Sequence, residues 1–173
     1  MTKTVFQILG SSHGVSGVAS IVLPDIFRLP KAGRVNNWNP LTLNLVDGEF
    51  ADYLGSNLGC RLCSDRLKSI LDSHAFVSDD IQWLPVVVEQ GTIKKNYSIL
   101  HFPNPPDILH KNKTIFVDDF VVKPVLSADA IGQHKVFSYP QGGELPLFIT
   151  QSVKEAIDSE GCTGLEFTRV AVV

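Results

Sequence analysis

The sequence predicts a single α+β domain over residues 1–173, with a mainly antiparallel sheet, two short repeated helix-strand units and long surface loops. Nine short segments alternate apolar and polar residues and are rich in β-branched and aromatic side chains, which is the pattern of half-buried strands. Only two segments have the i, i+3, i+4 apolar spacing of a helix face. Because 44% of the residues are hydrophobic, a chain of this length can build a core without disulfides or metal.

The expected strands run along the whole chain and are joined by polar or glycine-containing connections. They cover residues 4–9, 18–23, 41–46, 81–88, 97–102, 114–120, 135–139, 145–148 and 165–172. The connection YPQGGELP contains Gly142 and Gly143, and glycine readily supplies the positive φ of a hairpin turn, so we expect antiparallel pairing there. Residues 28–40 and 103–113 are rich in Pro, Asn and Lys and should form surface loops.

The two expected helices have nearly the same sequence, SDRLKSILDS at residues 64–73 and TQSVKEAIDS at residues 150–159. Ser64 and Thr150 are plausible N-caps. The expected apolar faces are Leu67, Ile70 and Leu71 in the first helix, and Val153, Ala156 and Ile157 in the second. A strand follows each helix, so we expect two helix-strand units packed on one sheet. Independent convergence of two amphipathic helices would give the same similarity.

Charge and cysteine content point to a cytoplasmic protein without nucleic-acid or membrane partners. The net charge is −3 and the basic residues are scattered, so no nucleic-acid footprint is visible. The first apolar run is too short for a secretory signal, and no run approaches the ~20 residues that span a bilayer. An odd number of cysteines, 3, fits a reducing compartment.

Cys60 and Cys63 form a C-x-x-C pair just before the first expected helix. Such a pair could act in redox chemistry, because a helix N-terminus lowers the pKa of a nearby thiol, but no buried βαβ strand precedes it here. The pair could also bind zinc together with Cys162 and His74, although the second half of a zinc pattern is missing. The third interpretation, structural thiols near a helix start, leads us to expect no metal and no cofactor.

Other polar residues do not form a recognisable catalytic set. Gly10, Gly14 and Gly17 fit neither the G-x-G-x-x-G pattern nor a Walker loop, the two common phosphate-binding motifs. Ser12 and His13 are adjacent, but the sequence identifies no oxyanion donors and no carboxylate that would orient the histidine. His101 lies in a strand and is expected to be a hydrogen-bonded structural residue. Asp118 and Asp119 should point to opposite faces of the strand at 114–120, so they would not converge as a glycosidase pair. We expect no catalytic residues.

Asn36, Asn37 and Trp38 in the loop VNNWNP are the candidate partner-binding residues. An aromatic anchor flanked by amides is typical of a protein-binding hot spot. Trp38 could instead fold back as a lid on the edge of the sheet.

The segment LFITQSVKEAIDSEGCTGLEFTRV, with its Gly164-Leu165-Glu166-Phe167 strand start, resembles the closing segment of a family of bacterial immunity proteins from polymorphic toxin systems. The S-x-x-L-x-x-x-L helix from Ser64 and the two strands after it are similar to the central part of that family. The resemblance covers about residues 58–172. It implies a cytoplasmic, non-enzymatic protein that binds and neutralises one cognate toxin domain. The alternatives are a small enzyme that uses Cys60 and Cys63 or the loop at residues 10–17, and a structural assembly subunit.

Overall fold

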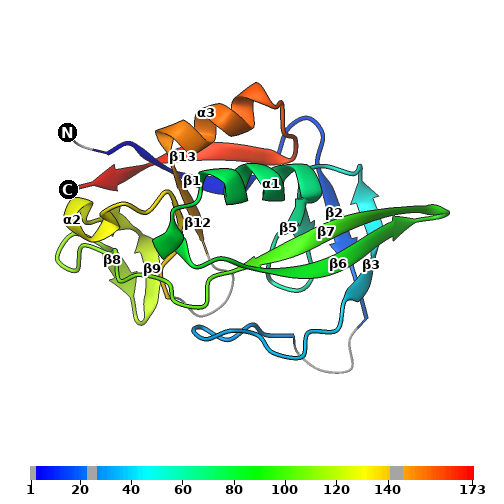
Figure 1. Cartoon of the computed structure of the whole chain (residues 1–173), viewed down its shortest axis with the longest axis horizontal. Coiled ribbons are helices and arrows are strands. Elements are labelled where there is room, and N and C mark those ends of the chain that lie inside the picture. The colour runs from blue at the N-terminus through cyan, green and yellow to red at the C-terminus, as the bar shows by residue number, and fades with distance from the viewer. Residues whose placement is uncertain (1–2, 23–26, 141–145) are drawn as a thin grey trace.

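Both ends of the chain build one open sheet, and the middle of the chain builds a second, closed sheet (Figure 1). The computed structural model describes residues 3–22, 27–140 and 146–173. The open sheet has the strand order β10 (Val125–Leu126), β13 (Leu165–Val172), β1 (Val5–Gly10), β12 (Leu147–Thr150), β11 (Val136–Phe137). The closed sheet has the order β2 (Gly17–Ser20), β3 (Leu41–Gly48), β6 (Gln82–Gln90), β7 (Ile93–His101), β5 (Leu62–Ser64), β4 (Tyr53–Ser56).

Most strand pairs are antiparallel, which confirms the predicted α+β class with a mainly antiparallel sheet. β1 lies between β12 and β13 and is antiparallel to both, whereas β10–β13, β2–β4 and β3–β6 are parallel. The antiparallel pairing across YPQGGELP is also confirmed, since Val136 pairs with Ile149 in β11 and β12. The turn residues Gly142 and Gly143 lie outside the described residues.

The first helix forms as predicted. α1 (Asp65–His74) begins after Ser64, whose Oγ accepts a hydrogen bond of 3.2 Å from the Leu67 amide and so satisfies one of the free N–H groups of the first turn. Leu67, Ile70 and Leu71 are buried. The expected apolar face is therefore confirmed.

The second helix, α3 (Gln151–Ser159), is confirmed in position but not in its cap. Thr150 precedes the helix, but its side chain makes no capping hydrogen bond and lies 3.2 Å from the Ser152 hydroxyl instead. Val153 and Ile157 are buried, and Ala156 packs against the same core from a partly buried position. The other helical elements are short: η1 (Val77–Asp79), a single 3-10 turn, and α2 (Ala128–Ile131).

The two helix-strand units do not pack on one sheet, so that expectation is wrong. The strand after α1 is β6, which pairs with β7 along its whole length and so belongs to the closed sheet. The strand after α3 is β13, which belongs to the open sheet. The helices themselves lie side by side, as Figure 1 shows, and share one core with Ile8, Leu147 and Ile149 of the open sheet. The opposite face of the open sheet is covered by a second core that includes Phe137 and Phe148.

A turn glycine fixes the contact between the two sheets. Gly164 has φ +82°, and a side chain there would place Cβ 2.5 Å from the Tyr53 carbonyl oxygen of β4. The Tyr53 amide donates to the Thr163 carbonyl over 3.2 Å beside it. The glycine that begins the G-L-x-F strand therefore has a structural reason, since only glycine combines this φ with so close an approach.

Several strand boundaries differ from the sequence prediction. The expected strand at 114–120 is wrong: it is a hairpin, β8 (Ile115–Val117) and β9 (Phe120–Lys123), that turns at Asp118 and Asp119. Asp118 has φ 53°, a left-handed conformation that Asp tolerates in tight turns. The short strands β4 and β5 were not predicted, and β7 begins at Ile93 rather than Tyr97. The expected strands at 18–23 and 145–148 reach residues 23 and 145, which lie outside the described residues.

Candidate functional site

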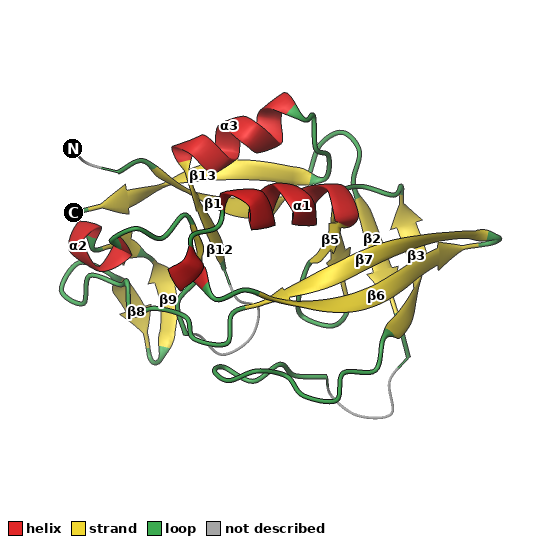
Figure 2. Cartoon of the chain, viewed as in Figure 1, coloured by secondary structure: helices red, strands yellow, loops and turns green. Residues whose placement is uncertain are grey.

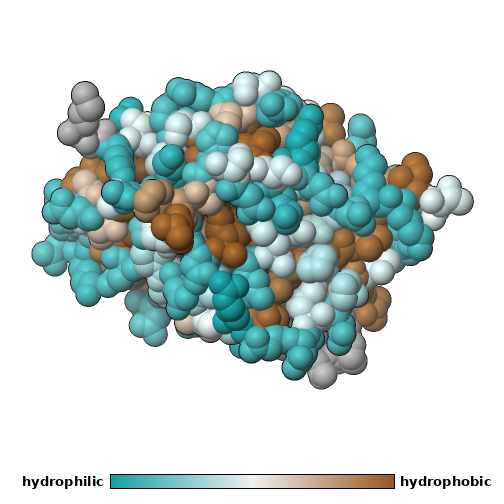
Figure 3. Space-filling model, viewed as in Figure 1, coloured by the Kyte–Doolittle hydropathy of each residue, from teal (hydrophilic) through white to brown (hydrophobic). Residues whose placement is uncertain are grey.

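The hairpin β8–β9 exposes more large apolar side chains than any comparable described segment of the chain. In the described residues it pairs with no further strand and stands beside the two sheets (Figure 2). Its exposed fractions are 51% for Ile115, 43% for Phe116, 58% for Val117, 60% for Phe120 and 62% for Val122. On the face of the molecule shown in Figure 3, apolar side chains appear only in small groups among hydrophilic ones. Five exposed large apolar side chains within one hairpin form a denser group than elsewhere in the described residues.

The base of the hairpin is held firmly. The Thr114 hydroxyl donates to the Val125 carbonyl over 3.0 Å and accepts from the Val125 amide over 3.2 Å, and the His110 amide also donates to that carbonyl over 2.7 Å. These bonds tie the two ends of the hairpin to each other. The exposed apolar side chains are thus presented on an anchored element rather than on a free loop.

A cavity of about 560 Å³ lies beside the hairpin. Its described lining comes from five separate segments of the chain. These are residues 27–31, residues 53–63 with β4 and β5, the end of β7 with Phe102, Phe120 of β9 and Leu147 of β12. Leu58, Cys63, Phe102 and Leu147 are buried and form much of its apolar wall. Phe120 belongs both to this lining and to the exposed hairpin. The two features therefore form one continuous candidate surface.

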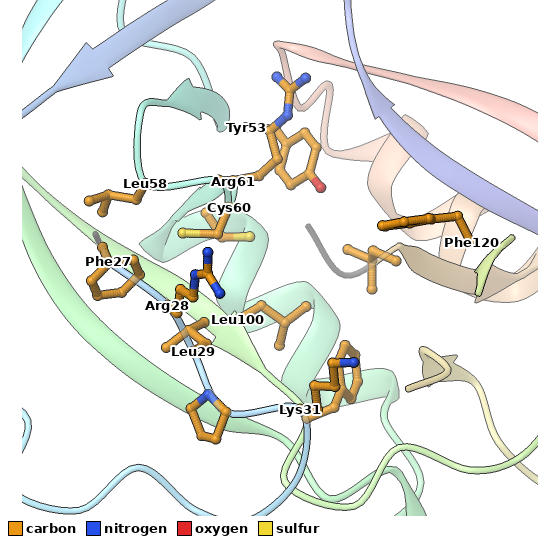
Figure 4. A pocket seen from close by; sticks show the side chains of 15 residues that line it. Phe27, Arg28, Leu29, Lys31, Tyr53, Leu58, Cys60, Arg61, Leu100 and Phe120 are labelled. Atoms are coloured by element: carbon orange, nitrogen blue, oxygen red, sulfur yellow. The ribbon is translucent and has the colours of Figure 1, made fainter. Parts of the chain in front are cut away.

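The charged side chains of the cavity are all basic among its described lining residues. Arg28, Lys31 and Arg61 line it, and neither Asp nor Glu does. In Figure 4, Arg61 lies at one end beside Tyr53, and Arg28 extends toward Cys60. The Arg61 guanidinium is 5.7 Å from the centre of the Tyr53 ring, a cation–π distance. A smaller cavity of about 230 Å³ shares Tyr53, Arg61 and Leu147 with the first.

Cys63 and Cys162 do not have the properties of redox-active cysteines. Cys63 lies in β5 and is 1% exposed, and burial, together with nearby Cys60 and Asp52, raises the pKa of its thiol. Burial likewise raises the pKa of Cys162 to about 11. A reactive cysteine requires the opposite change, a lowered pKa that favours the thiolate. The burial of Cys63 and the raised pKa values of these two thiols thus argue against the redox alternative.

The zinc alternative also lacks its ligand set. Within the described parts of the chain, no three His, Cys, Asp or Glu side chains come together in a group that could hold a metal ion. His74, the proposed fourth ligand, instead has its Nδ1 3.0 Å from the Ile70 carbonyl oxygen at the end of α1. The residues that the sequence suggested are therefore not gathered for metal binding.

His101 has the structural role that was predicted. The side chain is fully buried, and its Nε2 lies 2.7 Å from the Gly33 carbonyl oxygen. The Gly33 amide in turn donates to the Pro103 carbonyl over 2.7 Å. His101 therefore anchors the loop at residues 28–40 to the end of β7.

The remaining catalytic candidates, Ser12, His13, Asp118 and Asp119, are all exposed. Ser11, beside Ser12, uses its hydroxyl to donate to the His13 carbonyl over 2.6 Å, a local turn contact, and His13 is exposed. Asp118 and Asp119 are exposed in the β8–β9 turn. Their expected placement on opposite faces of one strand is wrong, because the chain reverses there.

The loop that carries Asn36, Asn37 and Trp38 lies along the closed sheet. Trp38 is partly buried, donates from Nε1 to the Pro85 carbonyl over 2.9 Å and meets the Phe27 ring edge-on at 6.0 Å. This geometry matches the alternative in which Trp38 covers the sheet. Asn36 and Asn37 are exposed, and their part in binding a partner stays a prediction.

Sequence reasoning missed both the hairpin and the cavity. The signal for the hairpin was present in IFVDDFVVK, where two adjacent acidic residues interrupt an apolar run at a turn. The cavity gave no comparable signal, since its lining is drawn from segments far apart in the sequence.

No model of a known protein family matches the chain, and no curated protein is significantly similar to it. The resemblance to immunity proteins is therefore still a prediction. Among the described residues, no helix has the length and apolar character needed to cross a membrane.

Proposed function

We propose that this chain is a non-enzymatic immunity protein that binds and neutralises a cognate bacterial toxin domain in the cytoplasm. The observation that carries the proposal is the anchored hairpin β8–β9 with its exposed apolar side chains. The resemblance of residues 58–172 to immunity proteins supports the choice of a toxin as the partner.

The hairpin has the properties of a protein-docking element. Single exposed apolar residues are ordinary on protein surfaces, but a contiguous group on one element usually marks an interaction site. Phe116 and Phe120 supply two aromatic side chains, and aromatic residues are enriched in the centres of interfaces. A strong complex typically buries about 1,600 Å² in total, so the toxin would also cover surface next to the hairpin.

Co-expression tests the proposal directly. The chain is expressed with the toxin domain encoded beside its gene, and both growth and co-purification are scored. We expect survival together with a stable complex. Survival without a complex would instead favour an enzyme that acts on the product of the toxin. A complex that gives no protection would favour the assembly-subunit alternative.

A hairpin variant then localises the interface. Phe116→Ala should weaken toxin binding about thirtyfold, or ~2 kcal/mol, because a truncated aromatic anchor loses contacts that water does not replace. The matched control is Ile93→Ala at the start of β7, where the side chain is 52% exposed but lies outside the hairpin. Equal effects of the two variants would contradict the proposed site.

A further inference from the structure

The basic residues at the cavity are unusual for this chain. The whole sequence has 18 acidic and 15 basic residues, yet the described lining of the cavity includes three basic residues and no acidic one. Arg28 and Lys31 form no ion pair with any described residue. Two cations without a carboxylate partner among the described residues therefore lie at a concave, largely apolar site. Such a site attracts a negatively charged ligand.

The walls of the cavity favour an apolar body. Leu58, Phe102 and Leu147 are 6%, 2% and 4% exposed, and Phe27 and Leu100 add further apolar surface. The volume of about 560 Å³ falls within the ~300–1,000 Å³ of typical small-molecule sites. Pockets of this kind bind through apolar contact and use a few polar groups for orientation.

We infer that the cavity binds a small amphipathic anion, namely an acyl chain of medium length that ends in one carboxylate. Arg28 and Lys31 supply the positive charge that attracts the carboxylate, because guanidinium and ammonium groups form charge-assisted hydrogen bonds with such a group. The chain lies against Leu58, Phe102 and Leu147. A cationic ligand would be repelled by the basic lining, and a neutral one would gain nothing from the two cations. The inference concerns this chain alone and does not depend on a toxin.

Calorimetric titration of the purified full chain tests the inference. The probes are decanoate, decan-1-ol and decyltrimethylammonium, which share one apolar chain and differ in the charge of the head group. We expect one decanoate to bind per chain with saturation. The alcohol should bind at least about tenfold more weakly, since it cannot form the charge-assisted contacts. The cation should not bind.

Substitutions at the cavity separate the head-group site from the chain site. Arg28→Gln combined with Lys31→Gln should weaken decanoate binding at least about tenfold and leave decan-1-ol binding unchanged. Leu100→Trp should abolish the binding of both, because the larger side chain fills the apolar part of the cavity. Cys60→Trp is a second filling variant in case Leu100→Trp unfolds, as thermal unfolding would show. Arg169→Gln, at an exposed position on β13 outside the cavity lining, is the matched charge control.

Three results would overturn the inference. The first is the absence of saturable decanoate binding to the folded chain. The second is equal affinity for the anionic, neutral and cationic probes. The third is decanoate affinity that stays unchanged in the Arg28→Gln, Lys31→Gln variant, or that falls equally in Arg169→Gln, because either result would place the anion elsewhere.

Discussion

Asp52 joins three elements of the fold through one carboxylate, so its replacement gives a sharp test of the structure. The carboxylate accepts hydrogen bonds from Arg66 Nη2 and Ser64 Oγ, each over 2.6 Å, and from the Thr163 amide over 2.8 Å. These partners belong to α1, to the N-cap of α1 and to the turn between α3 and β13. Asp52→Asn removes the charge and keeps the size of the side chain.

The magnitude follows from the pKa of Asp52. Burial alone would raise the pKa, but the hydrogen bonds from Arg66, Ser64 and Thr163 outweigh it and lower the pKa from 3.8 to about 2. The difference, 3.8 − 2 = 1.8, corresponds to about 2 kcal/mol at ~1.36 kcal/mol for each pKa unit. Because the Arg66 side chain is 49% exposed and screened by water, about 2 kcal/mol is the upper limit. This equals a fall of roughly 4–8 °C in Tm for a chain of this size.

The pH dependence provides the control on the mechanism. A folded-state pKa below the unfolded value means that the stabilisation is complete above pH 3.8 and is lost as pH falls toward about 2. Urea unfolding of wild type and Asp52→Asn should therefore differ at pH 7, and the difference should shrink toward pH 2. Asp158→Asn, at a side chain 51% exposed in α3, should change little at any pH. Equal stability of wild type and Asp52→Asn at pH 7, or a difference that does not depend on pH, would refute the reasoning.

Three further changes test other parts of the structure. Gly164→Ala should destabilise the fold by at least about 1–2 kcal/mol, because alanine is strained at φ +82° and would overlap the Tyr53 carbonyl. An unchanged midpoint of urea unfolding would contradict this contact between the sheets. Trp38→Ala should lower the free energy of unfolding by about 2 kcal/mol, since the side chain packs on the closed sheet. If the variant were as stable as wild type but bound the toxin more weakly, Trp38 would instead be a binding hot spot. Native Cys63 should resist a thiol reagent that reacts after denaturation, because it is buried and its pKa is raised; rapid reaction in the native state would revive the redox alternative.

Local features of the fold could be predicted from the sequence. The position and apolar face of α1 depend on residues within one or two turns of each other, from Ser64 to Leu71, and both agree with the structure. The long strands β3, β6 and β13 were predicted because alternation over eight or nine residues is a strong pattern. The short strands β4 and β5, four and three residues long, have too few positions to show alternation.

The arrangement of the strands in two sheets could not be predicted in the same way. β1 pairs with β12 and β13, whose residues lie more than 130 positions later, and no local pattern encodes such a pairing. The cap of α3 shows a related difficulty, because Thr150 is a favourable residue for that position but its hydroxyl has another neighbour in Ser152. The cavity depends on the same long-range pairings.

The position of the cavity links ligand binding to the association of the two sheets. Leu147 comes from the open sheet, Leu100 from the closed sheet and Phe120 from the hairpin, so the complete lining exists only when all three are in place. A ligand that binds this folded arrangement, and not the unfolded chain, stabilises it by about 2.7 kcal/mol at a concentration 100 times Kd. That stabilisation is comparable to the loss expected for Asp52→Asn. Decanoate at saturating concentration should therefore raise the Tm of the Asp52→Asn variant back toward that of the unliganded wild type. It should not do so in a chain that also carries Leu100→Trp, and a rise in Tm that persists in that double variant would place the ligand outside the cavity.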